Sequence, residues 1–283
     1  MQQKYLPLLV AAASLVVLPL VLPAVGLTLT TATDVVIFAI ACMGLNILVG
    51  TTGLVSFGHG AFYGLAAYAA ALSQRHWFPG DIVIPSLFAI ASVAVFAWLA
   101  GFLILRRRGV YFSLLTLALA AMLFTIAFRW TALTGGESGL GGVVRPVVLG
   151  INLDRPWIYY GLVAIIGLLV ACFLWRFHRS PVGHVLVAIR ENEQRARFVG
   201  YPTDRYKLFA FTVSAAITAL AGTLSVFHHR FASAEPISVA FSGELLAMVI
   251  IGGMRSFLGP ALGALFFVIF RDSLSRATEN WLL

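Results

Sequence analysis

The stretch "GLNILVGTTGLVSFGHGAFYGLAAY" (Gly44–Tyr68) decides the fold of this chain, because it is apolar enough for a bilayer but unsuited to a plain membrane helix. It holds six glycines, two adjacent threonines, a serine and a histidine, where a simple span would consist of Leu, Ile, Val and Ala. Irregular backbone at membrane depth is tolerated only where it is buried in protein or lines a watery cavity. The stretch therefore predicts a broken or re-entrant helix near residues 50–60.

The rest of the chain is also strongly apolar. Of its 283 residues, 60% are hydrophobic and only 11% are charged, whereas soluble domains carry about a quarter charged residues. Strands of a membrane barrel would alternate in polarity, and these segments do not. We predict an all-α, polytopic helical membrane protein with about 8–9 transmembrane segments, some of them broken or re-entrant. The apolar segments lie near 5–27, 34–50, 54–73, 82–105, 110–130, 156–175, 208–227, 239–254 and 257–271.

Two basic stretches predict the orientation. One is Arg106–Arg108, and the other is 176–207, which holds seven of the nineteen Lys and Arg residues. Two helices separate them, so both lie on the same side, and the positive-inside rule makes that side cytoplasmic. The net charge of +8 then reflects basic loops rather than nucleic-acid binding. We expect a single transmembrane domain over 1–283, with Lys4 inside, a cytoplasmic loop at 176–207 and an external glycine-rich loop at 131–155.

The cytoplasmic loop contains a well-marked helix. Ser180-Pro181 is a helix start and Gly200, followed by Pro202, is a stop, as capping preferences require. The apolar residues between them recur at helical spacing, and Glu191–Arg195 and Glu193–Arg197 are favourable i,i+4 pairs. The apolar positions are Val182, Val185, Ile189, Ala196 and Val199. This pattern indicates an amphipathic helix of about five turns, which either lies on the membrane surface or docks a cytoplasmic partner.

Two short motifs resemble each other. "SFGHGAFYG" (Ser56–Gly64) and "SFLGPALGA" (Ser256–Ala264) share Ser-Phe followed by a Gly-x-x-x-Gly pair. One interpretation is an internal repeat of the kind that transporters contain. The other is helix packing, since Gly-x-x-x-Gly lets membrane helices approach closely.

Four blocks of this sequence together resemble one family, the permease subunits of bacterial branched-chain amino acid ABC importers, and within it the LivM-type subunits. The second block separates LivM-type from LivH-type subunits. The blocks are "GLNILVGTTGLVSFGHGAFYGLAAYAAAL", "RRRGVYFSLLTLALAAMLFTIAFRWTALTGGESGL", "SPVGHVLVAIRENEQRARFVGYPTDRYKLFAFTVSAAITALAGTL" and "ELLAMVIIGGMRSFLGPALGALFF".

The resemblance implies a membrane assembly with several partners. A LivH-type permease subunit shares the path, two ATP-binding subunits dock on cytoplasmic helices, and a periplasmic binding protein delivers the amino acid. The implied location is the bacterial inner membrane, with lipid around the chain. The residues implied to couple this chain to an ATP-binding subunit are Gly183, Arg190, Glu191, Asn192, Glu193, Ala196 and Gly200.

ATP chemistry is expected in other chains. A phosphate loop needs Lys after Gly, and the only lysines are Lys4, after Gln3, and Lys207, after Tyr206. We therefore expect no cofactor here, with ATP and Mg²⁺ on partner subunits, and no enzymatic activity in this chain.

The broken segment suggests where the substrate passes. Half-helix N-termini can meet a carboxylate, helped by the helix dipole, which predicts a path lined by Thr51, Thr52, Ser56 and Gly58. Packing of the glycines is the alternative. Glu244 is the best-placed intramembrane acid, either on the path or, as the alternative, a helix-start charge or a partner in a salt bridge.

His59 and the pair His228-His229 are interpreted as structural. His59 has no second ionisable residue nearby in its segment, so hydrogen bonding is favoured over a proton relay. Adjacent histidines point apart on a helix, and only Glu235 lies at ligand spacing from the pair, so we predict no metal site. A stand-alone ion-coupled carrier would need paired intramembrane carboxylates, and a membrane enzyme would need clustered catalytic groups.

Substrate and chain length stay open in the sequence. The resemblance makes leucine, isoleucine and valine the default substrates, while urea, short amides and other apolar or aromatic acids are carried by similar systems. Relatives usually continue past a position like Leu283 with another apolar helix, so we expect the chain to be truncated or unusually short.

Overall fold

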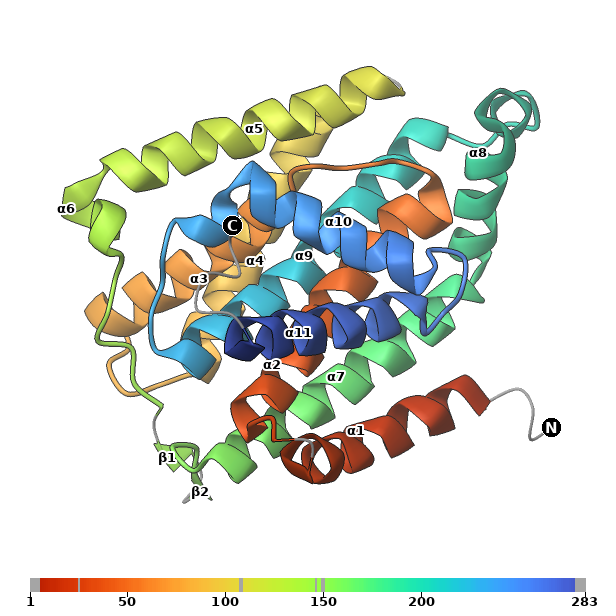
Figure 1. Ribbon diagram of the computed structural model, residues 1–283. Coiled ribbons are helices and arrows are strands. Elements are labelled where there is room, and N and C mark those ends of the chain that lie inside the picture. Colours follow the sequence, from red (N-terminus) through yellow and green to blue (C-terminus); the bar gives the residue numbers. More distant parts are fainter. Residues whose placement is uncertain (1–5, 25, 107–108, 146, 149–150, 278–283) are drawn as a thin grey trace.

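The protein is a bundle of helices in a computed structural model that describes residues 6–24, 26–106, 109–145, 147–148 and 151–277 (Figure 1). The expectations for Lys4, Arg107, Arg108 and the C-terminal residues 278–283 lie outside the described residues. The α-helices are α1 (Leu6–Ala24), α2 (Leu29–Asn46), α3 (His59–His76), α4 (Val83–Ile104), α5 (Val110–Arg129), α6 (Thr131–Thr134), α7 (Pro156–His178), α8 (Pro181–Phe198), α9 (Thr203–His229), α10 (Val239–Gly252) and α11 (Gly259–Ala277).

A few short elements complete the described part. Ile47–Thr52 is a π-helix that continues α2, and Gly136–Ser138 and Glu235–Ile237 are 3₁₀ turns. The strands β1 (Val147–Val148) and β2 (Ile151–Asn152) form one antiparallel pair, with Val147 opposite Asn152.

Within the described part of the chain, six helical segments are long and apolar enough to cross a membrane. They are Leu6–Pro23, Leu29–Thr52, Val83–Ile104, Val110–Arg129, Pro156–His178 and Thr203–His229. The other three apolar segments expected from the sequence correspond to α3, the shorter apolar helix α10, and α11. The prediction of an all-α polytopic membrane protein is confirmed.

Helices α2 and α9 form the centre of the bundle, and α3, α4, α10 and α11 pack around them. The α2 span is almost wholly buried, whereas α1, α4 and α5 leave much of their apolar surface uncovered. Figure 1 shows α1 and α5 on opposite flanks of the bundle. Apolar surface of this kind is normal for helices that face lipid or another membrane subunit.

The two ends of the bundle differ. Figure 1 shows α8 at one end, and α6 with β1 and β2 at the other. We name the end that carries α8 the cytoplasmic end, following the predicted orientation, and the opposite end the outer end.

Close helix contacts explain both Gly-x-x-x-Gly motifs. A Cβ on Gly60 would lie 2.6 Å from the carbonyl oxygen of Pro236, and one on Gly263 would lie 2.8 Å from the carbonyl carbon of Met248. These separations are too short for any side chain, so the packing interpretation is confirmed at these two glycines. The internal repeat stays a prediction.

Candidate functional site

The break predicted from the opening stretch is present. After α2 the backbone continues as the π-helix Ile47–Thr52, in which the Thr52 hydroxyl donates to the carbonyl oxygen of Ile47 at 2.8 Å. Gly53 then adopts a left-handed φ of 76°, a conformation that glycine tolerates best. Residues 54–58 are not helical, and α3 begins at His59. Short π-helical turns are rare in proteins and are frequently found at functional sites.

A buried chain of hydrogen bonds holds the start of α3 against α9 and α2. His59 Nδ1 lies 3.0 Å from Ser56 Oγ, and His59 Nε2 lies 2.8 Å from Ser214 Oγ. Ser214 Oγ donates its only hydrogen to the carbonyl oxygen of Gly44 at 2.6 Å. His59 Nε2 must therefore donate to Ser214, which leaves Nδ1 to accept from Ser56. This neutral, fully paired imidazole confirms the structural interpretation of His59.

Replacing His59 with Ala is expected to lower the free energy of unfolding by about 2–4 kcal/mol, because two buried hydroxyls lose a partner and a cavity opens. Thermal unfolding of the purified protein in detergent measures the effect. His76→Ala is the control, because His76 is exposed at the far end of the same helix. Equal melting temperatures for the two variants would contradict the structural role.

Three backbone N–H groups at the start of α3 already have side-chain partners. Phe57 N–H donates to Thr116 Oγ1 at 3.1 Å, and Gly60 N–H donates to Ser242 Oγ at 3.0 Å. Gly58 N–H donates to Ser56 Oγ at 3.3 Å. A substrate carboxylate at this helix start would have to displace these hydroxyls. Sequence reasoning did not identify them as partners of the backbone N–H groups.

The predicted path residues lie at different depths. Thr51, Thr52, Ser56 and Gly58 are all buried around the break. Thr51 donates to or accepts from His178 Nε2 at 2.8 Å and lines a cavity of about 470 Å³ at the cytoplasmic end. Glu244, which was also predicted on the path, does not line this cavity. The path assignment of these residues stays a prediction.

Glu244 lines a separate cavity of about 280 Å³ toward the outer end, together with Tyr63, Phe241 and Arg271. Its Oε2 lies 3.8 Å from Arg271 Nη1. The salt-bridge interpretation of Glu244 is confirmed, and a role on the path stays a prediction.

The cytoplasmic helix α8 forms where it was expected, but it is bent. Ser180 Oγ accepts from Gly183 N–H at 3.2 Å, which is the predicted N-cap. The helix is interrupted at Asn192, whose φ of −159° and ψ of 98° are extended. The Asn192 side chain accepts from Arg195 N–H at 2.9 Å and so caps a second short helix. The expectation of one uninterrupted helix over five turns is wrong for this reason.

The bend also changes one of the two predicted charge pairs. Glu191 binds the neighbouring Arg190 at 2.7 Å, and the guanidinium holds the pKa of this exposed carboxyl below its usual value. The expected Glu191–Arg195 pair needs continuous helix between its members, which the bend at Asn192 removes. The Glu193–Arg197 pair is confirmed at 3.2 Å.

Polar contacts from three side chains tie α8 to the bundle. Arg190 donates to the carbonyl oxygen of Gly50 in the π-helix. Glu193 Oε1 accepts from Lys207 Nζ at 2.9 Å, and Arg197 binds Asp204 at 3.0 Å. The cytoplasmic loop is thus bonded directly to the break between α2 and α3 and to the start of α9.

The far end of α8 carries exposed apolar side chains. Phe198 is 89% exposed and Val199 is 71% exposed, and Gly200 ends the segment with a left-handed φ of 97°. Val185, Ile189 and Ala196 face inward as expected, but Val199 does not. Gly183 is needed at the other end, since a Cβ there would lie 2.5 Å from the carbonyl oxygen of Phe177.

Sequence reasoning missed two residues around α8 and the break: Lys207, which binds Glu193 of α8, and His178, which binds Thr51 of the π-helix. Lys207 is buried, and His178 bonds both Thr51 and the Leu174 carbonyl oxygen. A lysine at the start of an otherwise apolar span was a usable signal for a buried ion pair. His178 carried no signal, because its partner lies far away in the sequence.

One group among the described residues has the composition of a metal site: Asp34, His228 and His229 at the outer end. From the sequence, only Glu235 was identified as an acidic residue at ligand spacing from the two histidines. Asp34 reaches them because α2 and α9 pack side by side.

Comparison with known proteins places the chain in a family. Residues 15–282 match the family described as branched-chain amino acid transport system, permease component. The chain is 32% identical over 275 residues to the high-affinity branched-chain amino acid transport system permease protein LivM of Salmonella typhimurium, over 89% of this chain and 64% of that protein. It is 32% identical over 280 residues to LivM of Escherichia coli, over 90% of this chain and 65% of that protein.

A more distant relative is the probable branched-chain amino acid transport permease protein LivM of Methanocaldococcus jannaschii, 26% identical over 202 residues, which cover 70% of this chain and 56% of that protein. The chain spans just under two thirds of the length of the two bacterial LivM proteins. No solved structure matches it with statistical significance. The family match covers nearly the whole length of the chain, and the apolar helices are those of a multi-pass membrane protein. The protein therefore belongs to the permease components of the branched-chain amino acid transport systems.

Proposed function

We propose that this chain is the LivM-type permease subunit of an ABC importer and forms part of the translocation path for branched-chain amino acids. The observation that carries the proposal is the bond from Arg190 in α8 to the carbonyl oxygen of Gly50 in the π-helix. Through it, a cytoplasmic helix contacts the break in the central span directly. A push on α8 is thereby transmitted to the backbone around Thr51 and Ser56.

The exposed end of α8 is the proposed docking surface for an ATP-binding subunit. Phe198 and Val199 present apolar area to the solvent there, and exposed apolar residues rimmed by charge are typical of interaction sites. Arg195 and Arg197 supply that rim. ATP and Mg²⁺ then belong to that partner, and this chain itself carries out no hydrolysis.

The remaining partners follow from the same proposal. A LivH-type subunit completes the path beside this chain, and a periplasmic binding protein delivers the amino acid at the outer end. The uncovered apolar faces of α1, α4 and α5 support contact with lipid and with a second membrane subunit. The proposed location is the bacterial inner membrane.

Reconstitution tests the proposal. The chain is placed in vesicles alone and with LivH-type and ATP-binding partners and a binding protein, and ATP-dependent leucine uptake is measured. We expect uptake only with the complete set, because energy enters through another subunit. Competition by valine, isoleucine, phenylalanine and urea then defines the substrate range.

One variant tests the proposed docking surface itself. Phe198→Ser removes the largest exposed apolar group of α8 and is expected to weaken binding of the ATP-binding subunit in a pull-down, and with it uptake. Uptake by the chain alone, driven by an ion gradient, would overturn the ABC assignment.

A further inference from the structure

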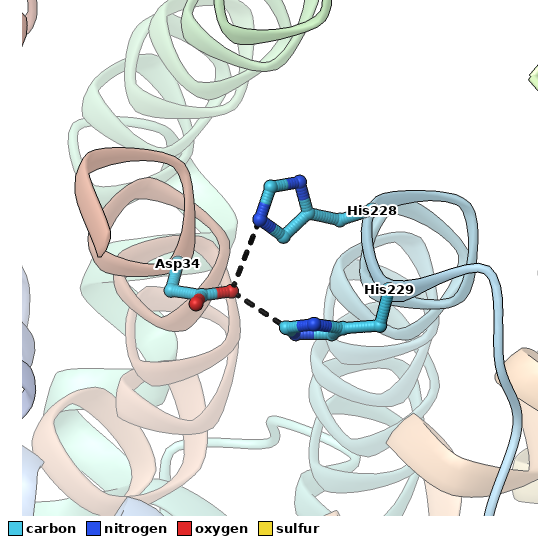
Figure 2. A group of neighbouring side chains, drawn as sticks. All are labelled: Asp34, His228 and His229. Carbon is cyan, nitrogen blue, oxygen red and sulfur yellow. Dashed lines mark ion pairs between the residues drawn. The ribbon is translucent and has the colours of Figure 1, made fainter. Parts of the chain in front are cut away.

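The two adjacent histidines that end α9 both point toward one carboxylate at the outer end of α2 (Figure 2). Asp34 Oδ1 lies 3.1 Å from His229 Nε2 and 3.7 Å from His228 Nε2. One ligand atom from each residue lies within 4.8 Å of the other two. The three side chains thus converge on one small volume.

The end of α9 explains why neighbouring residues can converge. The helix stops at His229, and Arg230 takes a left-handed conformation with φ of 57°. Without a following helical turn, the two imidazoles are free to turn toward the same side. The premise that adjacent histidines point apart holds inside a helix but fails at its last residue.

His228 supplies an independent observation. Its side chain is 6% exposed, its ring stacks on Tyr159 with an interplanar angle of 16°, and its Nε2 has no partner of normal hydrogen-bond geometry among the described residues. Buried polar atoms in proteins almost always have one. This nitrogen points at Asp34 from a distance too long for a hydrogen bond, which leaves room for a shared ligand between them.

We propose that Asp34, His228 and His229 form a binding site for a divalent transition-metal ion, with Zn²⁺ as the best match. Imidazole nitrogen and carboxylate oxygen are the ligands that Zn²⁺ takes, at about 2.0–2.2 Å, often three from protein with a fourth position open. Tetrahedral binding brings ligand atoms to roughly 3.3 Å from one another. The proposal requires side-chain rotation of the half-exposed His229 and of Asp34 to bring the ligand atoms this close.

The site is open to solvent at the outer end. His229 lines both outer cavities, of about 280 and 370 Å³, and Asp34 lines the larger one. A hydrated ion therefore reaches the site from outside, and a water molecule fills the open coordination position.

Arg145 limits the affinity of this site. Its guanidinium donates to the carbonyl oxygens of Phe227 and His228 and has one nitrogen 3.4 Å from His228 Nδ1. A metal on Nε2 requires the proton on Nδ1, so this weak contact is given up, and the cationic group repels the ion. Removing the charge with Arg145→Gln is expected to tighten metal binding several-fold.

Metal titration of the purified chain, carrying no polyhistidine tag and stripped with a chelator, tests the proposal. Zn²⁺ is titrated against a chromogenic chelator, and Co²⁺ absorption reports imidazole ligation. We expect one ion per chain, with binding weakened at least about tenfold in Asp34→Asn and in His229→Gln, since even outer-shell losses cost 10–100-fold. His76→Gln, an exposed histidine at the same end of the bundle, is the matched control and is expected to bind normally.

The thermal melt gives a second readout that does not depend on transport. Zn²⁺ is expected to raise the melting temperature of the wild-type chain and of His76→Gln, but not that of His229→Gln. Equal Zn²⁺ affinity in wild type, Asp34→Asn and His229→Gln would overturn the site, as would failure of the wild-type chain to bind. Neither result bears on the proposed import function.

Discussion

Replacing Glu193 with Ala is expected to detach the far half of α8 from the bundle and to abolish coupled uptake. Lys207 has a side chain only 3% exposed, and Glu193 is its shorter contact at 2.9 Å. Removing one partner of a buried pair costs about 3–5 kcal/mol, since the remaining charge is left uncompensated. We expect about 3 kcal/mol, because Asp204 still lies 3.3 Å from Lys207. That shifts a local opening equilibrium by roughly a hundredfold.

Thermal unfolding and ATP-dependent uptake measure the two consequences. Asp204→Ala is the matched control: it removes the other, largely exposed carboxylate near the same lysine, and exposed pairs contribute about 0–1 kcal/mol. The double variant Glu193→Ala with Lys207→Met is expected to recover most of the stability, because no buried charge remains. A Glu193 variant as stable as the Asp204 variant would refute this account.

Replacing Gly222 with Val is expected to prevent stable folding. Gly222 lies where α9 crosses α3, and a Cβ there would lie 2.8 Å from the carbonyl carbon of Tyr63 and still closer to its oxygen. Both atoms are backbone, so relief requires the two helices to separate. Overpacking of this kind typically costs 1–3 kcal/mol, and more where backbone must move, and we expect about 4 kcal/mol or more.

The yield of monodisperse protein and its melting temperature check this prediction. Gly161→Val, on the helix α7, is the control, because a Cβ at Gly161 meets no atom of the described residues within 4 Å. That variant is expected to stay within about 0.5 kcal/mol of wild type, since membrane helices tolerate β-branched residues on open faces. Comparable losses in the two variants would point to helix propensity rather than to the contact.

Much of the fold could be predicted because the relevant signals are local. Runs of about 20 apolar residues identify spans, and Ser180-Pro181 marks a helix start through the groups next to it in the chain. The break at 50–60 was predictable for the same reason, since Gly50, Gly53, Thr51 and Thr52 all lie within it. The bend at Asn192 was missed although its signal is local. Asn is a favoured N-cap residue and Glu193 places an acid in the first turn after it, but this signal competed with a continuous helical stripe.

The candidate site was predictable only in part. Arg190 and Glu193 were identified through the resemblance of their block to a family segment. Their partners, the Gly50 carbonyl oxygen and Lys207, come from other helices. Likewise, His59 was assigned to hydrogen bonding from its sequence context, but Ser214 as its partner depends on how α3 and α9 cross.

The sequence by itself determined the all-helical membrane fold, the broken central segment, the capped cytoplasmic helix and the family. Hydropathy, capping and backbone preferences act over a few residues, so they are readable from neighbours in the chain. Only the tertiary structure decided that Lys207 is neutralised by Glu193, that the predicted path residues Thr51 and Glu244 line different cavities, and that Asp34 meets His228 and His229. Those pairings depend on the register and rotation of packed helices, and close-packing of whole surfaces sets both.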